Sequence, residues 1–254
     1  MSLGASADGK ITLHRDRILL RPEHRRVWAS LSQDDAGPPV EQRLDVQATL
    51  EGSGSLVDHD AGPLTGLPAP TADPAELHTH HLPPSVVDDP ARRYWFAAVN
   101  GRGRVRWQQE NPPGWAVLVL VCRSTPLDYL QWLRQRSICY LVAGAEQVDL
   151  PSALDALGDE LGITRLASTA GGSLNAALLR AGLIDEVELT LFPALVGGAD
   201  TPTILDGTPL GPEQLPTRLE LLASEVMPRG TVRLRYRVSA SASASASASA
   251  SAGD

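Results

Sequence analysis

Two adjacent glycines, Gly171 and Gly172, stand where an extended segment ends and an amphipathic helix begins. Glycine lets a ligand approach the backbone closely, and the first amide groups of the helix, those of Ser173 and Leu174, have no partner within it. Free amides at the positive end of a helix dipole favour a phosphate group. Many strand-to-helix turns use two glycines only for their geometry, so the pair alone indicates either an anion site or a plain turn.

A second candidate anion site follows another apolar run. Residues 117–121 lead into Arg123 and Ser124, just before a helix that is expected to start at Pro126. An arginine and a hydroxyl group at a strand end, beside a helix N-terminus, suit the 2′-phosphate that distinguishes NADP from NAD. The alternative is an arginine that caps a loop.

Neither the histidines nor the cysteines form a convincing metal motif. His78, His80 and His81 lie close together, but no Cys and no regular Asp or Glu spacing accompanies them. The only two cysteines, Cys122 and Cys139, lie in or beside apolar runs, which is typical of buried free thiols. We therefore expect no metal, and no zinc site of the kind that nucleotide deaminases use.

Alternating strands and helices must position the candidate residues. Strands are expected at 46–50, 94–99, 117–121, 138–142 and 163–167, with helices at 22–31, at 127–135 and from Pro151 to Leu161. This β–α–β–α–β order predicts parallel strands with right-handed crossovers. After the helix at 172–181, the strand at 186–191 alternates apolar and polar residues, which predicts one buried and one wet face. Residues 218–226 and 231–238 are expected to pair as an antiparallel hairpin.

Composition limits the class of protein. The chain has 254 residues, of which 43% are apolar and 20% charged, as expected for one large globular domain. A formal net charge of −8 argues against a nucleic-acid or anionic-membrane binder. Without a long apolar stretch or a signal peptide, a cytoplasmic location is expected. We expect the domain to end at residue 238, because residues 239–254 are a Ser/Ala tail that has nothing to bury.

The stretch from 169 to 198 resembles the C-terminal half of the reductase domain of bacterial riboflavin biosynthesis. The shared motifs are Gly171-Gly172, Leu174-Asn175, Ala181-Gly182-Leu183, Asp185-Glu186 and the run 193–198. Near the N-terminus, Ser6, Asp8, Gly9 and Lys10 are similar to a second element of that family. The resemblance spans most of residues 5–238 and implies the α/β fold of dihydrofolate reductase, in which helices flank a mixed, mostly parallel sheet.

The resemblance also implies a function. It implies an NADPH-dependent reductase, and most specifically one that reduces a ribosylamino-pyrimidine 5′-phosphate to the ribitylamino form, like 5-amino-6-(5-phosphoribosylamino)uracil reductase. It further implies a homodimer, and a chain that holds the reductase but not the deaminase. The residues expected to hold the dinucleotide are Gly52, Gly54, Ser55, Arg123, Ser124, Gly171, Gly172, Ser173 and Leu174.

The catalytic residues implied by the resemblance are fewer. Lys10 would bind the substrate phosphate and Asp8 would orient the substrate, although an ordinary Asp-Gly turn explains both equally well. Glu51 is a candidate from position and not from the resemblance, because relatives tend to be apolar there. As the acidic residue nearest to a predicted cofactor loop, it is a candidate general acid, with water as its rival.

Two departures from the family concern the substrate. Ala170 stands where relatives commonly carry an acidic residue, and Gly66 follows Thr65 where an arginine is usual. The alternatives are therefore a reductase of the same superfamily with another substrate, dihydrofolate included, or a non-catalytic NADP- or pterin-binding protein.

Overall fold

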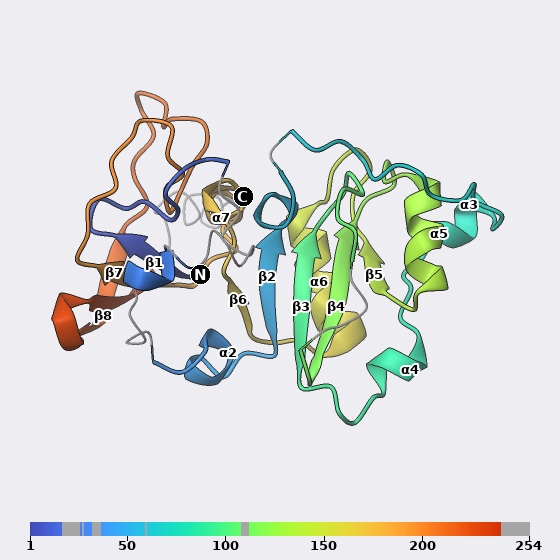
Figure 1. Cartoon of the computed structure of the whole chain (residues 1–254), viewed down its shortest axis with the longest axis horizontal. Coiled ribbons are helices and arrows are strands. Elements are labelled where there is room, and N and C mark those ends of the chain that lie inside the picture. The colour runs from blue at the N-terminus through green and yellow to red at the C-terminus, as the bar shows by residue number, and fades with distance from the viewer. Residues whose placement is uncertain (17–25, 27, 32–36, 59, 108–111, 240–254) are drawn as a thin grey trace, which may run out of the picture.

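The computed structural model describes residues 1–16, 26, 28–31, 37–58, 60–107 and 112–239, which form two sheets. Figure 1 shows the two sheets side by side, with helix α7 (Gly172–Arg180) between them. The larger sheet has the strand order β5-β4-β3-β2-β6, and every neighbouring pair in it is parallel. Its strands are β2 (Ala48–Gly52), β3 (Tyr94–Val99), β4 (Trp115–Val121), β5 (Cys139–Val142) and β6 (Leu166–Ser168). The expected parallel sheet is therefore confirmed.

Helices cover both faces of this sheet because its central strands are apolar throughout. On one face, Leu118 and Leu120 of β4 pack in a cluster with α6 (Leu150–Leu161) and α7. On the other face, Val119 and Val121 belong to a second cluster with α5 (Leu127–Gln135). Helix α6 begins at Asp149, whose carboxylate accepts the amide of Ser152, and ends at Gly162 in the left-handed region (φ 64°).

The smaller sheet has the order β1-β7-β9-β8. Its strands are β1 (Ser2–Ser6), β7 (Glu186–Phe192), β8 (Leu219–Val226) and β9 (Val232–Val238). β1 and β7 are parallel, and β8 and β9 form an antiparallel hairpin around the 3-10 turn η2 (Pro228–Gly230). The expected C-terminal hairpin is confirmed.

The expectation of a wet face on β7 is wrong. Glu188 and Thr190 are only 5% and 7% exposed. β7 lies between β1 and β9, and Arg43 of α2 (Val40–Arg43) reaches over it, with its guanidinium 2.6 Å from Glu188 Oε1. Ser2 donates a second hydrogen bond to the same oxygen. The carboxylate is therefore paired beneath this cover instead of hydrated.

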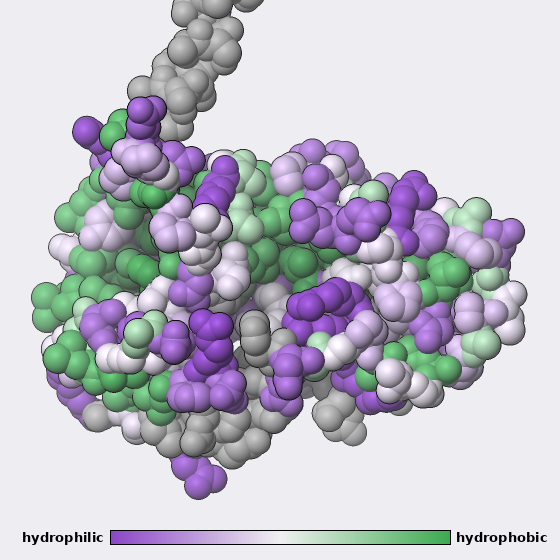
Figure 2. Space-filling view, turned by 90° about the horizontal axis from the view of Figure 1, so that it is seen from above, coloured by the Kyte–Doolittle hydropathy of each residue, from purple (hydrophilic) through white to green (hydrophobic). Residues whose placement is uncertain are grey.

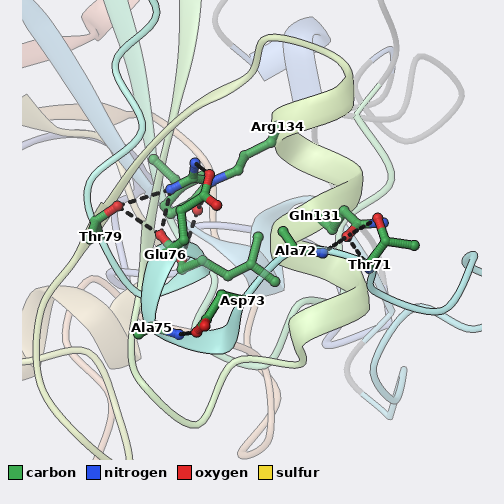
Figure 3. A network of polar contacts seen from close by, with 10 residues as sticks. Thr71, Ala72, Asp73, Ala75, Glu76, Thr79, Gln131 and Arg134 are labelled. Atoms are coloured by element: carbon green, nitrogen blue, oxygen red, sulfur yellow. Dashed lines mark hydrogen bonds and ion pairs between the residues drawn. The ribbon is translucent and has the colours of Figure 1, made fainter.

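The Pro- and His-rich segment from 58 to 90 contains two one-turn helices, α3 (Pro74–Leu77) and α4 (Pro84–Val87). Figure 3 shows how α5 holds this segment: Gln131 accepts the amides of Thr71 and Ala72, and Arg134 pairs with Glu76. The segment is therefore held against α5 by these contacts. No periodicity in its sequence predicted them.

Two expectations fall wholly or partly outside the described residues. Of the short helix expected near residues 22–31, the structure describes residues 26 and 28–31, which are helical. Residues 240–254, which make up nearly all of the Ser/Ala tail, lie outside the described part.

Candidate functional site

Two strand-to-helix turns lie next to each other at the carboxyl ends of β2 and β6. The two strands are paired, with Leu50 opposite Ser168. β2 runs into the 3-10 turn η1 (Ser53–Ser55), and β6 runs through Thr169 and Ala170 into α7. A Cβ placed on Gly52 would lie 3.7 Å from the side chain of Leu174, so the turns are in contact. In α/β proteins, ligands bind at this end of parallel strands.

Both turns present backbone amides. Gly171 is the N-cap of α7 without any side-chain cap, and the amides of Gly172, Ser173 and Leu174 have no acceptor among the described residues. η1 likewise begins without a side-chain cap. A Cβ added to Gly171 or Gly54 would meet nothing within 4 Å. The turns therefore leave room in which an anion could approach their amides.

The second glycine of the pair, Gly172, has a structural role. A Cβ on Gly172 would lie 2.3 Å from the carbonyl oxygen of Thr203 and 2.7 Å from Oδ2 of Asp206. Asp206 in turn accepts hydrogen bonds from the amide and hydroxyl of Thr203. The segment around 203–206 therefore packs against the start of α7, and only Gly171 leaves its side open.

Glu51, the residue before Gly52, is a buried carboxyl group between the two turns. It is 6% exposed; the hydroxyl of Thr169 donates to its Oε1 at 2.7 Å, and its Oε2 has no hydrogen-bond partner among the described residues. Burial raises the pKa of Glu51 to about 7, against the hydroxyls of Thr169 and Ser55 and the backbone of Gly52, which lower it. The group can therefore hold a proton near neutral pH.

Arg104 is a site residue that the sequence did not reveal. Arg104 belongs to the arginine-rich run at 101–107 and is 6% exposed, and Val105 and Trp107 of the same run are buried in the core. The amide of Arg104 is held by Asn100, and its guanidinium donates to Ser53 Oγ at 2.8 Å and to the carbonyl of Ala61. A buried cation is therefore hydrogen-bonded to the first residue of the turn that follows β2.

Arg123 and Ser124 lie at the end of β4, two strands from β2 and so roughly 10 Å away at about 4.8 Å per strand. The hydroxyl of Ser124 donates to the carbonyl of Glu146, whereas the side chain of Arg123 is exposed. The structure thus places these two residues at the same edge of the sheet as the glycine turns. The hydroxyl of Ser124, however, is already hydrogen-bonded to the loop after β5.

Asp8 and Lys10 lie on the other side of α7, at the end of β1, and both contact the loop after β7. Asp8 accepts hydrogen bonds from the amides of Val196 and Gly197 and from the hydroxyl of Ser6. The Ser6 hydroxyl, and then these amides, lower the pKa of Asp8 to about 2. Lys10 donates to the carbonyl of Thr201. Their roles toward a substrate stay a prediction.

The histidine segment shows structural contacts. His80 accepts the amide of Val142, and the backbone of His81 pairs with Tyr140. Within the described ranges, no three His, Cys, Asp or Glu side chains are grouped so that they could hold a metal ion. In the same ranges no helix is long and apolar enough to cross a membrane. Both cysteines are buried free thiols.

The position before the glycine turn is fully enclosed. Ala170 is 0% exposed, and its carbonyl accepts the amide of the buried Asn175 side chain. The carboxyl group between the two turns is therefore supplied by β2, through Glu51, and not by the residue before the glycine turn.

The fold and the paired turns define the chain as an α/β protein of the dihydrofolate-reductase-like class. More narrowly, it belongs to the family described as the RibD C-terminal domain, whose sequence profile matches residues 1–233. The expected family and fold are thereby confirmed.

Two relatives carry the name 2,5-diamino-6-ribosylamino-4(3H)-pyrimidinone 5′-phosphate reductase. The protein from Methanothermobacter thermautotrophicus is 32% identical over 161 residues, which are 63% of this chain and 72% of the relative. The protein from Archaeoglobus fulgidus is 27% identical over 208 residues, or 82% of this chain and 85% of the relative.

Among solved structures, Acinetobacter baumannii RibD superposes with a TM-score of 0.59 at 20% identity. The match covers 94% of this chain and 56% of RibD, so the chain spans about half the length of that protein. At this identity the match shows the shared fold.

Proposed function

We propose that this chain is an NADPH-dependent reductase of riboflavin biosynthesis that converts a ribosylamino-pyrimidine 5′-phosphate into its ribitylamino form. The observation that carries the proposal is the contact between the two amide-bearing turns, with the buried Glu51 between them. Membership of the RibD C-terminal domain family and the names of the two archaeal relatives support it.

The residues present fit a dinucleotide. The open side of Gly171 and the unpaired amides of Gly172, Ser173 and Leu174 suit its diphosphate. Gly52, Gly54 and Ser55 would line the neighbouring turn, and Arg123 and Ser124 would meet the 2′-phosphate.

When bound, NADPH would supply the hydride that reduces the open-chain sugar carbon, and the residues of this chain would align the substrate and provide the proton that completes the reduction. Glu51 would hold that proton, because its pKa of about 7 keeps much of it neutral at physiological pH. Lys10 would bind the substrate phosphate once released from Thr201, while Asp8 keeps the loop after β7 in place.

The relatives' names indicate which pyrimidine to test first. Both are named for the 2,5-diamino-pyrimidinone, which still carries the amino group that the aminouracil lacks. We propose the diamino form as the first candidate substrate and the aminouracil as the second.

Purified protein should therefore bind NADPH and oxidise it when either ribosylamino-pyrimidine phosphate is added, with loss of the reduced-nicotinamide absorbance as the readout. Dihydrofolate is the control substrate. Turnover of dihydrofolate alone would favour another reductase of the superfamily, and binding without turnover would favour the non-catalytic alternative. Absence of NADPH binding would refute every version of the proposal.

Arg123→Ala tests the cofactor assignment. If Arg123 contacts the 2′-phosphate, the substitution weakens NADPH binding by about tenfold, or 1.4 kcal/mol, and leaves NADH binding unchanged. Equal loss for both cofactors would assign the arginine to structure.

We further propose that the enzyme is cytoplasmic and that it is a homodimer.

A further inference from the structure

A cavity of about 280 Å³ opens at the amino ends of β3 and β4. Its wall is formed by the start of β4, by α4 with the segment that follows it, and by the residues just after α5. Figure 1 shows α4 at this lower end of the larger sheet, whereas the arrowheads of β2 and β3 point to the upper end. Figure 2 views the molecule from that upper end, so the cavity lies on the far side of the view.

The strand register separates this cavity from the site between the two turns. Glu51 is level with Ala98 of β3, and Ala98 is level with Val119 of β4. Trp115, in the cavity wall, stands four residues before Val119, or roughly 13 Å along the strand at about 3.3 Å per residue. β4 is also two strands away from β2. None of the residues expected to hold the dinucleotide lines the cavity.

Aromatic rings form much of the cavity wall. Trp107 and Trp115 both line it, together with Val117 and Ile138. The indole N–H of Trp107 donates to the buried hydroxyl of Tyr129, so the polar atom of this ring is already satisfied. The wall therefore offers apolar ring surface, against which a flat aromatic ligand packs well.

Two arginines add positive charge to the same wall, and each lies over a further tryptophan. The guanidinium carbon of Arg92 is 4.4 Å from the ring centre of Trp95, and that of Arg136 is 4.5 Å from the ring centre of Trp132. Four of the five tryptophans of the chain therefore line the cavity or contact its arginines. Such contacts hold a guanidinium in place without neutralising its charge.

The two arginines differ in what they can offer a ligand. Arg92 donates to the carbonyls of Val86 and Val87 and so ties α4 to the wall. The exposed guanidinium of Arg136 makes no hydrogen bond or ion pair in the part of the chain that the structure describes. A guanidinium that contacts a ring through its face keeps its N–H groups for a carboxylate. Arg136 is therefore a positioned cation with available donors.

The charge of the wall matches a single negative charge on the ligand. Asp89 is the one acidic residue among the described residues of the wall, and its carboxylate accepts the amide of Ala91. Two arginines and one aspartate give the wall a net charge of +1, in a chain whose formal net charge is −8. A monovalent anion balances this charge.

We propose that this cavity binds a small aromatic carboxylate, with its ring against Trp107 and Trp115 and its carboxylate paired with Arg136. An arginine and a carboxylate form a charge-assisted, often bidentate pair. A volume of about 280 Å³ lies at the lower limit of ligand pockets, so the cavity suits one or two rings and excludes a dinucleotide. The proposal goes beyond the reductase function and does not depend on it.

Calorimetric titration of the full chain with 2-naphthoate, a two-ring carboxylate, tests the inference. It should bind with a Kd below about 1 mM, and the neutral 2-naphthalenemethanol should bind at least about tenfold more weakly. Saturating NADPH should leave naphthoate binding unchanged, because the two sites are separate. The inference is overturned by absence of binding, by equal affinity for the neutral alcohol, or by displacement of naphthoate with NADPH.

Two variants place the bound naphthoate in this cavity. Arg136→Gln removes the charge without breaking a hydrogen bond, and should weaken naphthoate binding at least about tenfold. Ser85→Phe introduces a ring at an exposed position of the wall and should block binding. The matched control Arg218→Gln removes the same charge from an exposed residue outside the cavity, and its affinity should stay within about twofold. Unchanged naphthoate binding in either cavity variant would also overturn the inference.

Discussion

The carboxyl group of Glu51 combines burial, an unpaired oxygen and a pKa near 7, which together suit a proton donor. A donor must be protonated, so the wild-type rate should fall as the pH rises through about 7. Glu51→Gln keeps the shape but has no acidic proton, and we expect kcat to fall by about 100-fold or more, the usual contribution of general acid catalysis. Steady-state rates between pH 5.5 and 9 would measure both effects.

Thr169→Val tests the same assignment by changing the pKa of Glu51 without removing its carboxyl group. The hydroxyl of Thr169 stabilises the charged form of Glu51, so its removal should raise the pKa and move the descending limb of the rate profile to higher pH. NADPH affinity should stay within about twofold in both variants. If Glu51→Gln retains more than a third of the wild-type rate, the proton comes from elsewhere, with water as the first candidate.

Arg104 would act one step away from the proposed dinucleotide, because its guanidinium donates a hydrogen bond to Ser53 in the β2 turn. Arg104→Met removes that bond and the bond to Ala61, and we expect about tenfold weaker NADPH binding by fluorescence titration. Arg104→Lys should restore part of the affinity. Arg102→Met removes the same charge from an exposed neighbour and should change little. Equal losses in the two methionine variants would mean that only the net charge matters.

At the scale of elements, the two glycines at the start of α7 differ: Gly172 is packed against residues 203–206, whereas Gly171 has open space beside it. Gly172→Ala forces a Cβ against the carbonyl of Thr203, so we expect a loss of roughly 2 kcal/mol or more in the free energy of unfolding. Gly171 has φ −68° and open space, so Gly171→Ala should leave stability unchanged within about 1 kcal/mol. Its effect should be on NADPH affinity, because the methyl group intrudes where the diphosphate would lie.

Urea unfolding and NADPH titration of these two variants give a simple comparison. If Gly171→Ala binds NADPH as the wild type does, the amides of α7 are not the diphosphate cradle. If Gly172→Ala is as stable as the wild type, the packing of residues 203–206 on α7 is looser than described.

Elements with local signals could be predicted from the sequence. The run at 117–121 is apolar throughout, as expected of a strand covered on both faces, and α5 and α6 do cover both faces of β4. The alternation in β9 and the turn at 228–230 specified the hairpin in the same way. These patterns are local, because each residue's environment follows from its neighbours in the chain.

Contacts between distant residues carried no such signal. Glu188 alternates like a solvent-facing residue, yet it is buried under Arg43, 145 positions away. Arg104 sits in an arginine-rich run with two glycines, which is typical of a solvated turn, yet it is buried and its guanidinium donates to Ser53 and Ala61 in a distant segment. The packing of Asp206 on Gly172 likewise joins two segments that no periodicity connects.

At the scale of the whole molecule, three groups make stability depend on pH in different directions. The low pKa of Asp8 stabilises the folded chain above pH 4, and this contribution is lost as the pH falls toward 2. Burial, followed by the charge of Arg134, lowers the pKa of His81, so its contribution rises with pH near 6.5. Glu51 acts in the opposite sense, because its folded pKa is raised.

Comparison of the wild type with Glu51→Gln isolates the contribution of Glu51 to the pH dependence of stability. Between the ordinary pKa of 4.5 and the folded value of about 7, the folded chain binds more protons than the unfolded chain. The wild-type free energy of unfolding should therefore lose roughly 3 kcal/mol from this group across that window and none above it. Since the glutamine stays neutral, the variant should be the more stable protein at pH 8 by up to about 3 kcal/mol, and equal within about 1 kcal/mol at pH 5. Urea unfolding at the two pH values, without ligand, measures this difference, and a difference that does not change with pH would show that Glu51 stays ionised in the folded chain.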